Sequence, residues 1–173
     1  MKKINLQSLV LSGLFAALVC VATMIIHIPT PTKGYVNLGD GVVNVCAWVL
    51  GPIYAPAATG IGSALADIFS GYPVYAPATF VIKALMAVVA YFVFYILKKH
   101  LNPITAYVVS SIASEIIMCV GYFLFEGFIY HSFAIAALGI QANLVQGAIG
   151  MISSVLLYET IVKHIHLSIN GAN

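Results

Sequence analysis

The chain has 173 residues, of which 62% are hydrophobic and 7% charged, and its mean hydropathy is +1.04. This composition excludes an ordinary soluble domain, because a chain of this size cannot bury so much apolar surface away from water. The net charge of +2 is small and no basic stripe suited to phosphates is present, which excludes nucleic acid as a partner. We therefore expect an integral membrane protein.

The first apolar run extends from about residue 6 to 28 and ends at Pro29. It has no clear cleavage site, so we interpret it as a retained helix and not as a removable signal. Small residues repeat every four positions, with Ser12, Ala16 and Cys20 on one face and Gly13 and Ala17 on the adjacent face. Such a surface lets another helix approach closely, and both packing within the chain and docking of a partner remain open.

Two shorter helices are expected next, at about residues 39–51 and 56–70. The first of them is short for a membrane span, so it is either tilted or only part of a span. Ala58, Gly62 and Ala66 repeat every four residues and predict a tight hairpin between the two helices.

Three longer helices complete the prediction, at about residues 77–98, 103–126 and 132–163. Asn102 is a good cap for the second of these, and the last is expected to break near Gly139. The fold class is thus a single all-α membrane domain over the whole chain, a bundle of six transmembrane helices with both termini on one side.

The distribution of lysines predicts on which side of the membrane the termini lie. The side of the termini would hold Lys2, Lys3, Lys98, Lys99 and Lys163, which leaves Lys33 in an opposite loop and Lys83 inside a helix. The positive-inside rule then predicts that the N and C termini are cytoplasmic. The loops rich in tyrosine face outward.

Ionisable residues at membrane depth indicate a site, because a charge facing lipid costs at least a few kcal/mol. Asp67 and Lys83 differ in depth by only about 5 Å and are predicted to pair. Glu115 falls near mid-membrane, where a carboxyl group must be protonated, paired or hydrated. Structural roles stay open, since Lys83 can reach the interface and buried amides can join helices.

Polar groups are concentrated in the outer halves of the helices, which predicts a pocket open to the outside and not a pore. Tyrosines around it suit a flat heteroaromatic ring. The candidate ligand-binding residues are Tyr35, Asn37, Asp40, Asn44, Asp67, Tyr72, Tyr75, Lys83, Glu115, Tyr122, Asn143 and Gln146.

Three stretches carry a family resemblance, namely LVLSGLFAAL, YVNLGDGVVNVCAWVLGP and GIGSALADIFSGYPVYAPATFVIKAL. They resemble the substrate-binding S components of energy-coupling factor (ECF) vitamin transporters, with Gly13 a departure from the usual alanine. They look most like the subgroup assigned to pyridoxine or hydroxymethylpyrimidine, and riboflavin and thiamine carriers are its neighbours.

The resemblance implies a multi-pass protein of a prokaryotic plasma membrane that captures a vitamin on the outer face. It also implies docking on a transmembrane coupling subunit (EcfT-like) that carries two ATPases, through Ser12, Gly13, Ala16 and Ala17. The chain contains no phosphate-binding loop of the G-x-x-x-x-G-K-[ST] type, so ATP would be hydrolysed by another chain. We expect no enzymatic activity, no cofactor and no metal.

Two other functions, an intramembrane enzyme and a solitary carrier, are alternatives to an S component. An intramembrane di-aspartyl enzyme is disfavoured because Asp40 and Asp67 fall at outer helix ends and not at a shared mid-membrane site. A solitary proton-coupled carrier is the stronger alternative, with Glu115, Lys83 and Asp67 as a relay, although no inverted repeat is found.

Overall fold

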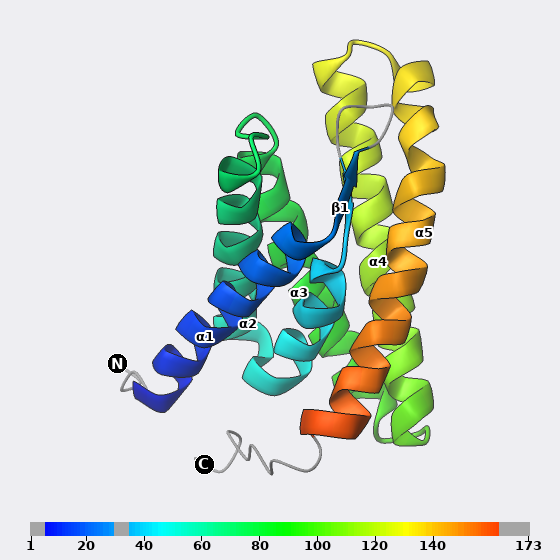
Figure 1. Cartoon of the computed structure of the whole chain (residues 1–173). Coiled ribbons are helices and arrows are strands. Elements are labelled where there is room, and N and C mark those ends of the chain that lie inside the picture. Colours follow the sequence, from blue (N-terminus) through cyan, green and yellow to red (C-terminus); the bar gives the residue numbers. More distant parts are fainter. Residues whose placement is uncertain (1–5, 30–34, 163–173) are drawn as a thin grey trace.

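The computed structural model describes residues 6–29 and 35–162 (Figure 1). Its elements are the α-helices α1 (Leu6–Ile25), α2 (Gly39–Phe69), α3 (Ala76–Leu97), α4 (Pro103–Ile129) and α5 (Phe133–Leu157), the π-helix η1 (Tyr158–Val162), and the strands β1 (His27–Pro29) and β2 (Tyr35–Asn37). Within this part of the chain, all five α-helices are long and apolar enough to cross a bilayer. Lys2, Lys3, Lys33 and Lys163 lie outside the described residues, so the cytoplasmic placement of the termini remains a prediction.

The helix α2 contains a sharp bend at Gly51, whose φ of 75° and ψ of −171° are not helical. Glycine adopts a positive φ without steric cost. Pro52 is the first residue of the second half, where a backbone N–H group needs no helical partner, and Pro56 follows one turn later. Figure 1 shows the chain turning back on itself at this bend.

The bend at Gly51 separates the two helices expected at 39–51 and 56–70, which form the two halves of the single element α2. The described residues therefore form five α-helices, and not the six that were expected. Asp40 and Asp67, 27 residues apart, would be about 40 Å apart in a straight helix, yet both lie close to Lys83. The first half of α2, residues 39–50, is only about 18 Å long, so it crosses part of the bilayer and not the whole of it.

Small residues on α2 bring other helices close. A side chain at Gly62 would collide with the backbone carbonyl of Ala16 on α1, and one at Gly60 would collide with Phe80 on α3. The expected hairpin contact between the two halves of α2 through Gly62 is therefore wrong. Of the two small faces of α1, the one with Ala16 packs inside the chain, whereas Gly13 has open space around it.

The segment after α1 differs from the sequence prediction. The first helix ends at Ile25 and not at 28, and the chain then forms an antiparallel ribbon in which His27 pairs with Asn37 and Pro29 with Tyr35. The cause is local, because a residue before proline is driven out of the helical region and into extended backbone.

The end of β2 lies deep in the bundle. The backbone N–H of Asn37 donates to Gln146 Oε1 at 2.9 Å, and Gln146 lies 13 residues, about 20 Å, from the start of α5. The N–H of Gly39 donates to Asn37 Oδ1 at 2.8 Å. These bonds satisfy irregular backbone at a depth where water is scarce, which is how non-helical segments are tolerated inside membrane proteins.

The remaining helices begin as expected. The Asn102 side chain accepts a hydrogen bond from Thr105 N–H at 2.9 Å, which confirms the predicted cap of α4, and Ser132 caps α5 in the same way. The expected break near Gly139 is wrong, since α5 runs through this residue. Gly139 is buried, so its missing side chain serves close packing and not a bend.

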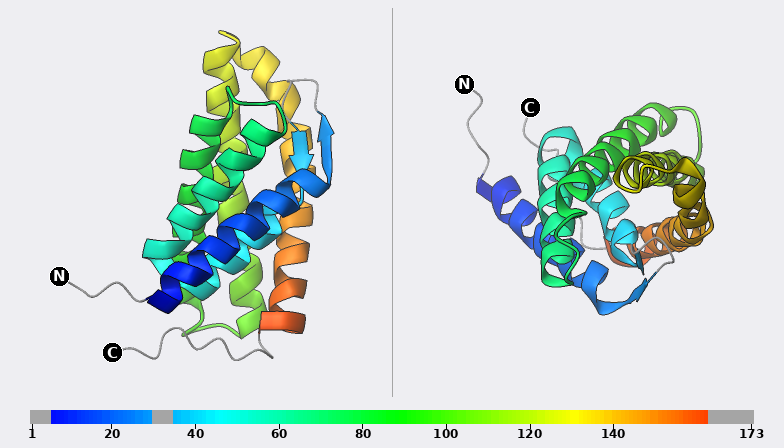
Figure 2. Two further views of the ribbon diagram at one scale, coloured as in Figure 1. Left: turned by 60° about the vertical axis from the view of Figure 1, so that its left-hand side comes forward. Right: turned by 90° about the horizontal axis from the view of Figure 1, so that it is seen from above.

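The connections are sorted between the two ends of the bundle. The ribbon and the connections at 70–75 and 130–132 lie toward one end, and the start of α1, the bend of α2, the connection at 98–102 and the end of α5 lie toward the other (Figures 1 and 2). We call these the ribbon end and the bend end. Helix α1 crosses α2 obliquely, and α4 and α5 run antiparallel side by side.

An aromatic cluster closes the bundle toward the bend end. The Trp48 ring lies 4.6 Å from that of Tyr107 and 5.6 Å from that of Tyr158, and its Nε1 donates to Ser110 Oγ at 3.1 Å. Phe94 stacks on Tyr107 with ring centroids 4.7 Å apart. Buried aromatic rings therefore fill this part of the bundle.

Candidate functional site

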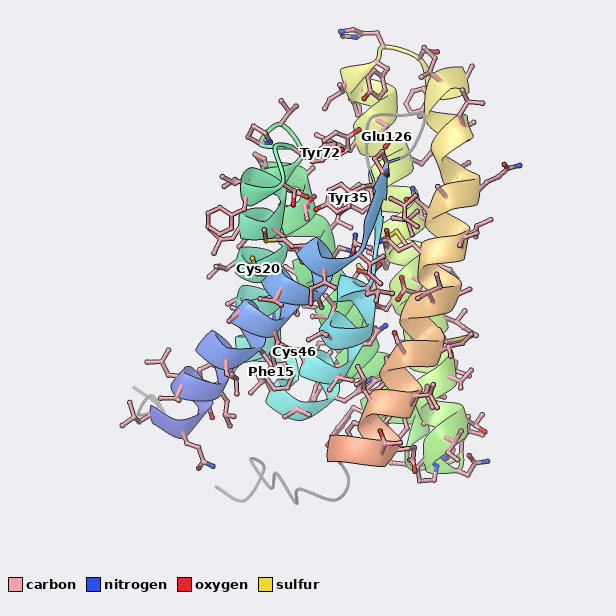
Figure 3. The ribbon with its side chains drawn as sticks, in the orientation of Figure 1. Phe15, Cys20, Tyr35, Cys46, Tyr72 and Glu126 are labelled. Atoms are coloured by element: carbon pink, nitrogen blue, oxygen red, sulfur yellow. The ribbon has the colours of Figure 1, made fainter. Side chains whose placement is uncertain are left out.

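A cavity of about 30 Å³ lies toward the ribbon end, between the pair α2–α3 and the pair α4–α5. All five α-helices and β2 contribute to its wall or to its edge. The lining residues are Thr23, Tyr35, Asn37, Ser63, Asp67, Tyr75, Thr79, Lys83, Tyr122, Glu126 and Asn143. Figure 3 shows Tyr35, Tyr72 and Glu126 gathered in this region, far from Phe15 and Cys46.

A buried ion pair forms the floor of the cavity. Lys83 Nζ on α3 pairs with Asp40 Oδ1 on α2, and their side chains are 2% and 0% exposed. Gln146 Nε2 donates to the other Asp40 oxygen, Oδ2, at 2.6 Å. The predicted partner of Lys83 was Asp67, and this prediction is wrong, because the first half of α2 places Asp40 beside α3 as well.

A second carboxyl group lies behind this pair. Glu115 Oε1 accepts from Asn44 Nδ2 at 3.0 Å, while Glu115 Oε2 is buried and has no hydrogen-bond partner among the described residues. Gly150 makes room for it, since a Cβ there would lie 2.7 Å from Glu115 Oε1 and 2.8 Å from the Cβ of Asp40. Glu115 therefore supports the floor and does not line the cavity.

The edge of the cavity is built from tyrosines. The Tyr35 hydroxyl donates to Asp67 Oδ1 at 2.6 Å, and its ring lies 4.9 Å from that of Tyr72. The Tyr75 hydroxyl donates to Glu126 Oε1 at 3.4 Å and lies 3.2 Å from the Tyr130 hydroxyl. Burial, together with these two neighbours, raises the pKa of Tyr75, so its phenol stays protonated and donates.

The candidate residues from the sequence fall into two groups. Those that line the cavity are Tyr35, Asn37, Asp67, Tyr75, Lys83, Tyr122 and Asn143, with Tyr72 against Tyr35 at the edge. Those behind it, which hold the floor together, are Asp40, Asn44, Glu115 and Gln146. The side chains thus converge on one hollow, and contact with a ligand remains a prediction for each of them.

Four lining residues were missed, namely Thr23, Ser63, Thr79 and Glu126. Three of them lie four residues from a candidate residue that was predicted from the sequence. Ser63 precedes Asp67, Thr79 precedes Lys83, and Glu126 follows Tyr122. Because residues four apart share a helix face, this spacing would have identified them once the inward face was known.

A separate groove of about 300 Å³ lies between α4 and α5, and apart from Glu115 its lining is almost entirely apolar. It is bordered by exposed side chains such as Ile116 and Leu144, which suit contact with acyl chains. Its lack of converging polar groups distinguishes it from the cavity at the ribbon end.

The comparison with known proteins decides the family. A family model described as the ECF-type riboflavin transporter, S component, matches residues 3–163. The chain belongs to this S-component family. A solved structure, described as the S component of a bacterial ECF transporter, matches this S component with a TM-score of 0.68 over 92% of this chain and 98% of that one, at 21% identity. The two proteins therefore share their fold.

A relative from Pyrococcus woesei, described as an uncharacterized protein in a gap 3'region, is 44% identical over 72 residues. The match covers 41% of this S component and 48% of the relative, so the chain spans about half the length of this curated protein. The family expected from the sequence is thus confirmed, and the chain is a multi-pass membrane protein. The pyridoxine or hydroxymethylpyrimidine subgroup stays a prediction.

Proposed function

We propose that this S component captures a small vitamin from outside the cell for ATP-driven uptake. The observation that carries the proposal is the cavity at the ribbon end, where tyrosines, ionisable groups and other polar side chains from six elements converge. The Trp48 cluster closes the opposite end, so the arrangement suits capture and not free passage. Transport then requires partners, which are a transmembrane coupling subunit and two ATPase subunits.

The ribbon end faces outward in this proposal, in a prokaryotic plasma membrane. Lys98 and Lys99 are the lysines of the described residues that lie in a connection, and this connection is at the bend end. Positive residues favour the cytoplasmic side, which turns the cavity toward the outside.

The ligand is a small single-ring vitamin of the pyridoxine or hydroxymethylpyrimidine type. Tyrosine faces suit a flat ring, and Asn37, Thr79 and Asn143 offer hydrogen bonds to ring nitrogens and hydroxyl groups. The cavity of about 30 Å³ holds one or two water molecules, whereas ligand sites usually measure several hundred Å³. Capture therefore requires Tyr35 and Tyr72 to move, and a small ligand requires less movement than riboflavin or thiamine, which are the alternatives.

Identification of the natural ligand tests this proposal. We expect protein purified from cells grown in rich medium to carry a small heteroaromatic vitamin, which is extracted and identified by mass spectrometry. Calorimetry with the identified compound should then give saturable binding at one site per chain. A folded protein that carries no such compound and binds no pyridoxine, hydroxymethylpyrimidine, riboflavin or thiamine would contradict the proposal.

The open small-residue face of α1 is the proposed docking surface for the coupling subunit. A Cβ added at Gly13 would meet no atom within 4 Å outside its own helix backbone, and Ala17, one turn later, is exposed, whereas Ser12 and Ala16 are half-buried. Gly13→Leu or Ala17→Leu should therefore leave ligand affinity unchanged and reduce uptake at least tenfold, because a bulky side chain prevents close helix approach.

Uptake of labelled ligand by cells that express the partner subunits measures this effect. The matched control is Ala137→Leu, which adds the same bulk at an exposed position of α5. Normal transport by the α1 variants would exclude the docking surface. Uptake by vesicles that contain this chain alone would instead support a solitary carrier.

A further inference from the structure

The charges around the cavity are unequal in sign. Asp67 on α2 and Glu126 on α4 line it, and both are buried, at 3% exposure each. The ammonium group of Lys83 also lines it, but this group is already paired with Asp40. One cation thus stands against three carboxyl groups, those of Asp40, Asp67 and Glu126, and the cavity favours a ligand that carries positive charge. An anionic ligand would find no unpaired cation among the described residues that line the cavity.

Asp67 has one oxygen available to such a ligand. Its Oδ1 accepts the Tyr35 hydroxyl at 2.6 Å, and its Oδ2 is buried with no hydrogen-bond partner in the described part of the chain. Ser63 Oγ, one helical turn earlier, lines the same cavity and is equally without a partner there. Buried polar atoms are normally hydrogen-bonded, so both atoms point to a bound donor.

The rings at the edge suit the same charge. Tyr35 and Tyr72 lie 4.9 Å apart between ring centroids, and Tyr72 and Tyr75 lie 6.4 Å apart with nearly perpendicular planes. The three rings are thus gathered at the edge of the cavity, and the electron-rich faces of tyrosine rings attract ammonium and ring cations. The structure itself contains this type of contact, because Lys83 Nζ lies 5.6 Å from the centroid of the Tyr122 ring.

We propose that the ligand is a cation, a small heteroaromatic compound whose protonated amine or ring nitrogen binds Asp67 while its ring lies among Tyr35, Tyr72 and Tyr75. This inference rests on the proposed capture function and specifies the chemical class of its ligand. The second oxygen of Asp67 receives the positive group, and Ser63 accepts or donates the neighbouring hydrogen bond. The Lys83–Asp40 pair stays intact and contributes no net charge.

Three compounds with one ring test the charge directly. Pyridoxamine, pyridoxine and 4-pyridoxate carry an ammonium, an uncharged hydroxyl and a carboxylate at the same position. At pH 7 we expect pyridoxamine to bind the full-length protein at least tenfold more tightly than pyridoxine, and 4-pyridoxate at least tenfold more weakly, as measured by calorimetry. Pyridoxine that binds as tightly as pyridoxamine, or a preference for 4-pyridoxate, would overturn the inference and leave the capture function in place.

A charge-neutral variant locates the effect. Asp67→Asn keeps an acceptor for the Tyr35 hydroxyl and should abolish the preference for pyridoxamine over pyridoxine. Glu159→Gln removes the same charge in η1, at the bend end and away from the cavity. This control variant should keep the preference. A preference that survives in Asp67→Asn would remove Asp67 from the proposal.

Failure of all three compounds has a separate meaning. If the folded protein binds none of them, the pyridoxine assignment is wrong, and the charge is then tested with thiamine, a cation, and riboflavin, which is uncharged. The inference requires that thiamine bind and riboflavin not bind. Any other result overturns it.

Discussion

Lys83→Ala is expected to destabilise the protein by about 3–5 kcal/mol, because it leaves the carboxylate of Asp40 buried without its cation. The remaining bond to Asp40, from Gln146 Nε2, does not replace a full positive charge. Ligand binding should weaken at least tenfold, about 1.4 kcal/mol, since the floor of the cavity loses its fixed geometry. Thermal unfolding in detergent measures the first effect and calorimetry on the folded fraction measures the second.

A double variant separates the charge from the loss of packing. Asp40→Asn with Lys83→Met removes both charges, keeps an acceptor for Gln146 and fills the space of the lysine stem. Replacing both members of a buried pair is usually far less costly than removing one, so this variant should regain most of the lost stability. An unfolding temperature of Lys83→Ala equal to that of the unchanged protein would show that Asp40 is not an ionised partner of Lys83.

Gln146→Leu should destabilise the protein by roughly 3 kcal/mol or more, because one amide joins three groups. Its Nε2 donates to Asp40 Oδ2 at 2.6 Å, and its Oε1 accepts from Asn37 N–H at 2.9 Å and from Asn37 Nδ2 at 3.2 Å. Leucine fills a similar volume and leaves all three groups buried without this partner, at a cost of about 1–3 kcal/mol each. Thermal unfolding measures the loss.

The same substitution on the exposed side of α5 is the control. Gln141 lies on the same helix with an exposed side chain, so Gln141→Leu should change stability by less than about 0.5 kcal/mol. Gln146→Leu should also reduce ligand binding, since Asn37 holds β2 and β2 carries Tyr35 at the edge of the cavity. Equal unfolding temperatures for the two leucine variants would show that the deep end of β2 is not held by Gln146.

The corrections to the predicted elements involve features that a pattern of apolar residues does not reveal. A run of apolar residues reports that a segment enters the membrane, and it was Gly51 and Pro52 that indicated where the helix is interrupted. The ribbon at 27–29 and 35–37 was predicted as a helix end and a loop, because its pairing depends on residues on both sides of a connection. Helix caps such as Asn102 were predictable because they act within one turn.

The polar residues show the same division. Asp40, Asp67 and Lys83 were recognisable from the sequence alone, since an ionisable group among apolar residues must find a protein environment. The sequence did not show which of the two acids pairs with Lys83, and the predicted partner was Asp67. The reason is that depth estimated from residue counts places both acids near Lys83 and does not show which carboxylate reaches it.

By itself, the sequence determined the membrane location, the family and most of the polar side chains turned inward, because the cost of exposing charge to lipid acts on each residue separately. Only the tertiary structure decided that Asp40 binds Lys83, that Gln146 holds the end of β2, and that one buried oxygen of Asp67 has no hydrogen-bond partner among the described residues. The first two contacts join residues as far apart as 37 and 146, and they exist because the reversal at Gly51 brings the start of α2 between α3 and α5.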